Sequence, residues 1–63
     1  MKIKIFELVE STGEKEKYVA INSTNVIKCE EKVEGNTLIT FTGGITAHVK
    51  GNLTSVVNQL NND

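Results

Sequence analysis

The sequence predicts an α+β fold: an antiparallel β-meander of four or five strands with one C-terminal helix packed on the sheet. Short β-rich runs alternate with turn residues, most clearly at residues 37–42 and 45–49, which flank the Gly43-Gly44 pair. The chain then ends in one apolar stripe at helical spacing, formed by Leu53, Val56, Val57 and Leu60. These two patterns predict a hairpin that leads directly into a helix.

The chain length predicts one small domain that spans residues 1–63. A chain of 63 residues lies near the lower limit at which a domain buries enough surface to fold alone. Aromatic residues are few, with two Phe, one Tyr and no Trp, so the core must come mainly from Ile, Val and Leu. Self-association is a common way to add burial, and the sequence therefore predicts a homo-oligomer.

The first strand is predicted at residues 2–10 and carries apolar residues on both faces. Ile3 and Ile5 fall on one face, whereas Phe6 and Leu8 fall on the other. Either both faces are partly covered or a bulge resets the register. With Ile3 and Ile5 assigned to the core, Phe6 and Leu8 form the candidate interface for a partner or a second copy.

The middle of the chain predicts a loop, a strand, a turn and another strand. Residues 11–16 are polar with a central glycine, as in a loop. Residues 17–22 form the second strand, and the small polar residues 22–25 form a turn or a single helical turn. The third strand is predicted at residues 26–34.

Turn residues also delimit the last elements. Residues 34–36 predict a tight hairpin turn before the fourth strand at residues 38–42. Gly43-Gly44 fits a two-residue primed turn before the fifth strand at residues 45–49. Asn52 is a good N-cap for the helix. The predicted core comprises Ile3, Ile5, Val19, Ile21, Ile27, Leu38, Phe41, Ile45, Val49, Leu53, Val56, Val57 and Leu60.

Charge disfavours nucleic-acid binding but leaves it open. The formal net charge is −1, and all seven basic residues are lysines. Nucleic-acid-binding proteins usually have more basic than acidic residues and use arginine to contact phosphates and guanines. The alternative is a lysine patch on one sheet face, for which the candidate contacts are Lys2, Lys4, Lys28 and Lys50.

No set of residues predicts catalysis, a metal site or a cofactor. His48 is the one histidine and Cys29 the one cysteine, and their spacing does not place them together. A metal site needs three or four His, Cys or carboxylate ligands. Gly43-Gly44 is not followed by the Lys-Ser/Thr of a phosphate-binding loop. We therefore expect a non-enzyme, with His48 exposed and Cys29 a small apolar residue.

Localisation is predicted to be cytoplasmic, without membrane binding. A single cysteine fits a reducing compartment, and the N-terminal residues lack the apolar run of a signal peptide. No apolar stretch approaches the ~18 residues of a membrane span. The abundance of Lys, Asn and Ile without Arg or Pro fits A/T-rich codons, which indicates a bacterium or a phage.

Residues 37–60, TLITFTGGITAHVKGNLTSVVNQL, resemble the C-terminal part of the FlbD family of small flagellar proteins. That family has a T-x-I-T-L-x-x-G hairpin, a V-K strand end and a short helix, and Asn22 to Glu30 resemble its N-x-x-x-I-x-x-I-E segment. This chain has Gly43-Gly44 where the family usually has Asn-Gly, and Ser23 where it often has Pro. The strand-strand-helix pattern is also similar to the longer, more basic LytTR domain. The FlbD resemblance implies a bacterial accessory or regulatory module without catalytic activity.

Together these patterns favour a non-catalytic accessory or regulatory protein of a bacterium or phage. We expect it to act as a protein-interaction module that uses a sheet face or an edge strand. A small nucleic-acid-binding domain is the alternative, and its binding must weaken steeply as salt rises.

Overall fold

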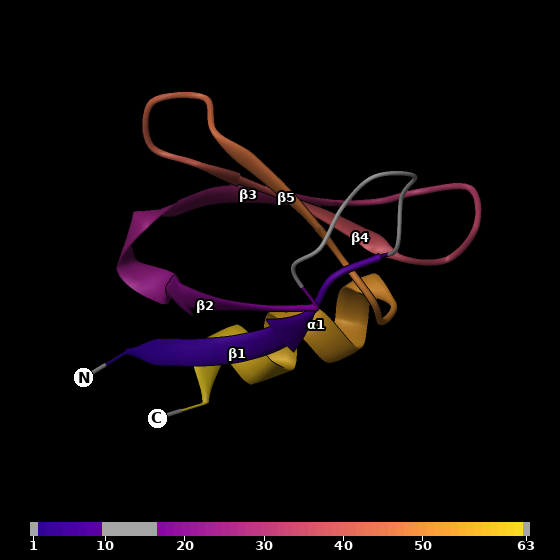
Figure 1. Ribbon diagram of the computed structural model, residues 1–63, viewed down its shortest axis with the longest axis horizontal. Helices are drawn as coiled ribbons and strands as arrows, with labels where there is room; N and C mark the ends of the chain where they lie inside the picture. Colours follow the sequence, from indigo (N-terminus) through magenta and orange to yellow (C-terminus); the bar gives the residue numbers. More distant parts are fainter. Residues whose placement is uncertain (1, 10–16, 63) are drawn as a thin grey trace.

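The computed structural model describes residues 2–9 and 17–62. In this part of the chain, strands, a 3₁₀ helix and an α-helix follow in the order β1 (Ile3–Glu7), β2 (Tyr18–Asn22), η1 (Ser23–Asn25), β3 (Val26–Glu31), β4 (Thr37–Phe41), β5 (Thr46–Val49) and α1 (Leu53–Asn61) (Figure 1). All strand pairs are antiparallel, so the predicted α+β meander with a C-terminal helix is confirmed. The predicted loop at residues 11–16 lies outside the described residues.

The first two strands form a two-stranded hairpin with an uninterrupted register. Phe6 is opposite Val19, and Lys4 is opposite Ile21. Because side chains alternate along a strand, Phe6, Val19 and Ile21 share one face of the hairpin. Phe6 and Ile21 are buried, so this face is the one that packs on the core.

Strands β3, β4 and β5 form a second, three-stranded sheet in that order. Its register shifts by one residue between Val26 and Lys28, which makes Ile27 the extra residue of a β-bulge. Beyond the bulge, Cys29 is opposite the buried Ile39 and shares its face. Ile27 itself is 62% exposed, so its predicted place in the core is wrong.

The connection between β4 and β5 is longer than predicted. The Phe41 N–H donates to the Ile45 carbonyl at 2.8 Å, so the loop contains Thr42 as well as the two glycines. Gly43 and Gly44 have φ values of +92° and +82°, which L side chains rarely adopt. Ile45 follows the loop at the end of the hairpin and is exposed, so its predicted core position is also wrong.

The two sheets are joined along β1 and β5. Leu8 forms an isolated antiparallel bridge with Val49. The Val9 N–H donates to the His48 carbonyl at 3.0 Å, and the Lys50 N–H donates to the Glu7 carbonyl at 2.8 Å. The strands therefore lie in the spatial order β2-β1-β5-β4-β3 around the core, and η1 connects the two outer strands.

The helix begins where Gly51 and Asn52 turn the chain out of β5. The Asn52 side chain accepts a hydrogen bond from the Ser55 N–H at 2.8 Å, which confirms it as the N-cap. A carboxylate oxygen of Glu31 accepts from the Leu53 N–H at 2.9 Å and satisfies a second free amide of the first turn. Within the described ranges, no helix has the length and hydrophobicity needed to cross a membrane.

The core lies between the hairpin, the three-stranded sheet and α1. Its buried apolar residues are Phe6, Ile21, Ile39, Val49, Val56 and Leu60. Four residues of the predicted core are exposed instead, namely Ile3, Ile5, Ile27 and Ile45. In β1 and β4 the buried residue lies one position from a predicted one, at Phe6 instead of Ile5 and at Ile39 instead of Leu38. A shift of one residue moves a strand's whole apolar set to the other face.

Thr37 is the fully buried polar residue of the core, and its hydroxyl donates to the Gly51 carbonyl at 2.9 Å. We expect Thr37→Val to lower the free energy of unfolding by about 1–3 kcal/mol, because the Gly51 carbonyl loses a partner. Thr46→Val, at an exposed position on β5, should change it by no more than about 0.5 kcal/mol. Urea unfolding followed by circular dichroism compares the two variants, and equal losses would show that the hydroxyl is not needed.

Candidate functional site

The structure places the predicted interface residues, Phe6 and Leu8, against the core. Phe6 is 3% exposed, and Leu8 is half-buried and packs on the same cluster. The prediction required this face of β1 to be free for a partner. That requirement is not met, because Phe6 and Leu8 fill the space between the hairpin and the second sheet within one chain.

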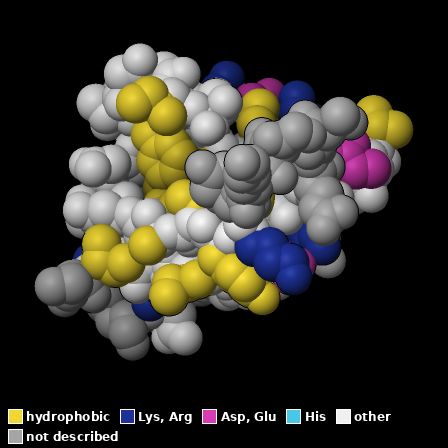
Figure 2. Space-filling model, in the orientation of Figure 1, with side chains coloured by type: hydrophobic (Ala, Val, Ile, Leu, Met, Phe, Trp, Pro, Cys, Tyr) yellow, Lys and Arg dark blue, Asp and Glu magenta, His cyan; other side chains and the backbone are white. Residues whose placement is uncertain are grey.

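The opposite face of the hairpin is the exposed apolar one. Ile3, Ile5 and Glu7 alternate with the core residues of β1, and their partners on β2 are Asn22, Ala20 and Tyr18. We call the residues Ile3, Ile5, Tyr18 and Ala20 the outer face. Ile5 is 68% exposed and Tyr18 is 60% exposed. Figure 2 shows hydrophobic side chains at the surface along β1.

Among the described residues of β1 and β2, one charged side chain borders the outer face, and it already has a partner. Glu7 projects from the same side of β1, and its carboxylate lies 3.0 Å from the amine of Lys50. The four residues of the outer face are uncharged, and so is the bordering Asn22. A partner that covers the outer face therefore meets an apolar surface with a neutralised charge at one end.

The candidate lysines do not act as one free patch in the described structure. The Lys4 amine donates to the Asn62 carbonyl at the C-terminal end of α1. Lys28 lies 3.5 Å from a carboxylate oxygen of Glu30, and Lys50 is paired with Glu7. Lys2 also has an interaction within the chain. Nucleic-acid binding through these lysines requires that they exchange these partners for phosphates.

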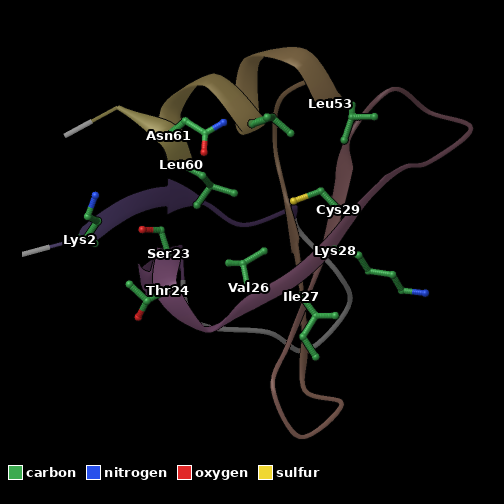
Figure 3. A pocket seen from close by; sticks show the side chains of 11 residues that line it. Lys2, Ser23, Thr24, Val26, Ile27, Lys28, Cys29, Leu53, Leu60 and Asn61 are labelled. Carbon is green, nitrogen blue, oxygen red and sulfur yellow. The ribbon is translucent and has the colours of Figure 1, made fainter.

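A groove of about 550 Å³ runs between α1, η1 and β3 (Figure 3). Its apolar wall consists of Val26, Cys29, Leu53, Val57 and Leu60, and Figure 3 shows Leu60, Val26 and Cys29 lying around it. Hydroxyl groups from η1 border one end. Cys29 supplies the one nucleophilic thiol of this groove.

The Cys29 thiol is only half-buried, but burial raises its pKa above the ordinary thiol value. Less thiolate is therefore present near neutral pH, and we expect iodoacetamide to react several-fold more slowly with the folded chain than with the urea-unfolded chain. The rate is measured by mass spectrometry at several pH values. Equal rates in the folded and unfolded chains would contradict the shielding. The raised pKa also means that folding stability falls as pH rises past the ordinary thiol pKa.

His48 faces a carboxylate rather than the thiol. Its Nε2 atom is shielded from solvent and lies 2.7 Å from Oε1 of Glu34. Among residues 2–9 and 17–62, no three His, Cys, Asp or Glu side chains gather closely enough to hold a metal ion.

Tyr18 and Ala20 are site residues that the sequence reasoning did not single out. The assignment of Val19 and Ile21 to one face of β2 leaves Tyr18 and Ala20 on the other, so alternation alone contains the signal. Alternation does not show that β2 pairs with β1, and this pairing is what brings Tyr18 and Ala20 beside Glu7 and Ile5.

Comparison with known proteins gives no relative: no family model, no curated protein and no solved structure matches this chain.

Proposed function

We propose that this protein is a non-catalytic interaction module that self-associates through its β1–β2 hairpin. The observation that carries the proposal is the exposed, apolar outer face, with Ile3, Ile5, Tyr18 and Ala20 on adjacent strands. Contiguous exposed apolar residues on a small protein indicate a contact surface more often than scattered ones do.

A second copy is the occupant that fits this surface best. In a twofold dimer the same patch lies on both sides of the interface, so the patch must be compatible with itself. An uncharged apolar face meets this condition, and Glu7 is already neutralised by Lys50 at 3.0 Å. A 63-residue chain also gains more from extra burial than a larger domain does.

The accessory or regulatory role in a bacterium or phage belongs to the same proposal. It is supported by the resemblance of residues 37–60 to the FlbD family and by the codon bias that the composition implies. Neither the groove beside α1 nor the His48–Glu34 pair supplies a nucleophile with its general base, which supports a binding role over a catalytic one.

Light scattering over a range of protein concentrations tests the proposal. We expect the mass of a dimer or a larger assembly for the unmodified chain. Ala20→Lys should shift the mass toward one chain, because Ala20 lies at the centre of β2 and on the outer face, where paired copies would bring two charges together.

Val33→Lys is the matched control, since it also places a lysine at an exposed apolar position. Val33 lies in the β3–β4 turn, away from the hairpin, and its variant should keep the mass of the unmodified chain. A single-chain mass for the unmodified protein at every concentration would overturn the proposal. An Ala20→Lys variant that keeps the full oligomer mass would also do so.

A further inference from the structure

We infer that two copies join edge to edge, with their β2 strands paired antiparallel about a twofold axis at Ala20. This inference rests on the proposed self-association and places its contact at the edge of β2, so that the outer faces of the two hairpins lie side by side on one sheet and do not pack against each other. The two hairpins then form one continuous sheet with the strand order β1-β2-β2-β1.

The two outer strands of the described structure differ in how their edges are protected. Strand β3 carries Lys28, Glu30 and Glu31 and is interrupted by the bulge at Ile27. Charges and bulges are the usual devices that keep an edge strand from pairing with another chain. Strand β2, with the sequence YVAIN, has no charged residue, no proline and no register shift. Of the two edges, β2 is therefore the one that is open to pairing.

The hydrogen bonds at both ends of the hairpin show which backbone groups of β2 point outward. The Leu8 N–H donates to the Lys17 carbonyl at 2.8 Å, and the Ser23 N–H donates to the Lys2 carbonyl at 2.9 Å. In an antiparallel pair, hydrogen-bonded positions alternate with non-hydrogen-bonded ones. The backbone groups of Val19 and Ile21 therefore point toward β1, and those of Tyr18, Ala20 and Asn22 point away from it.

This alternation selects one register for the dimer. An axis at Ala20 places Ala20 opposite Ala20 of the second copy and Tyr18 opposite its Asn22, so every outward-pointing residue of β2 is paired. An axis at Tyr18 or Asn22 would leave part of the strand unpaired, because η1 begins at Ser23. The chosen register also opposes no like charges.

A second groove, of about 460 Å³, lies along the same strand. It is lined by β2 together with Phe41, Thr42 and Ile45 from the β4–β5 hairpin. Ile45 is exposed and Phe41 is half-buried. Figure 2 shows hydrophobic side chains at the surface by the β4–β5 hairpin. A strand added to the edge of β2 would lie beside this groove and cover part of its apolar lining.

Cysteine cross-linking tests the register in the full-length chain. In a Cys29→Ala background, Ala20→Cys should give a disulfide-linked dimer in oxidised glutathione, because opposed residues at this axis have Cα atoms about 5.5 Å apart. Ile5→Cys should cross-link far more slowly, since three strand spacings, about 14 Å, separate the two β1 strands. Cross-linking through Ile5→Cys but not Ala20→Cys would overturn the edge pairing.

Proline at the same position tests the backbone contact without charge. The Ala20 N–H does not bond to β1, so Ala20→Pro leaves the hairpin ladder intact and removes the outward donor from each copy. We expect the dimer dissociation constant to rise roughly tenfold or more. Circular dichroism confirms that the variant is folded. A folded Ala20→Pro variant with an unchanged dissociation constant would overturn the inference.

The two proposals fail in different ways. If the unmodified chain is a single chain at all concentrations, self-association itself fails and the edge pairing fails with it. If the chain is a dimer and only Ile5→Cys cross-links, self-association holds and the outer faces, not the β2 edges, are in contact. Ile45→Lys tests a position that lies outside the outer face and lines the groove beside β2. This variant should weaken the dimer only if the second copy covers that groove.

Discussion

Phe6→Ala should lower the free energy of unfolding by about 3–5 kcal/mol, enough to leave much of the protein unfolded at 25 °C. Phe6 is 3% exposed and belongs to the core cluster between the hairpin and α1. A domain of 63 residues has a total stability of only about 3–9 kcal/mol. Urea titration followed by far-ultraviolet circular dichroism, at one fixed protein concentration, measures the loss.

Ile5→Ala is the matched control on the neighbouring residue of the same strand. Ile5 is 68% exposed, so its truncation should change the stability of the fold by no more than about 0.5 kcal/mol. The comparison decides which face of β1 is internal. A larger loss for Ile5→Ala than for Phe6→Ala would mean that the faces are reversed and that the outer face described here is the core face.

Ile39→Ala should lower the free energy of unfolding by about 2–5 kcal/mol. Ile39 has 0% exposure on β4, the central strand of the three-stranded sheet, and lies between Cys29 and Ala47 on the adjacent strands. Truncation leaves a cavity where three strands meet, and the surrounding backbone has little freedom to close it. Thermal or urea unfolding of the purified variant gives the value.

Ile27→Ala provides the same chemical change at the bulge of β3. Its side chain is 62% exposed, so we expect a change within about 0.5 kcal/mol. Comparable losses at Ile27 and Ile39 would contradict the bulge, because an uninterrupted β3 would turn Ile27 and Cys29 to the same face.

Local patterns were sufficient to predict the order of the elements. Gly35 has a φ of +95° in its predicted turn, and Asn52 caps the helix as expected. Turns and helix caps of this kind depend only on residues close in sequence, because they follow from the conformational preferences of Gly and Asn. Val56 and Leu60 are buried because a helix of this length needs tertiary packing of its apolar stripe.

The faces of β1 and β4 could not be assigned from local pattern. Ile5 and Phe6 are adjacent and both apolar, and so are Leu38 and Ile39, so alternation fits either face. The choice is made by contacts distant in sequence, such as the bridge between Leu8 and Val49 that ties β1 to β5. The candidate interface residues Phe6 and Leu8 therefore lie on the face of β1 that packs on the core.

The most direct test of self-association through β2 is the light-scattering mass of the unmodified chain beside that of Ala20→Lys. We predict a two-chain mass for the unmodified protein that falls on dilution, and a one-chain mass for Ala20→Lys at the same concentrations. One-chain masses for both proteins, or two-chain masses for both, would contradict the account.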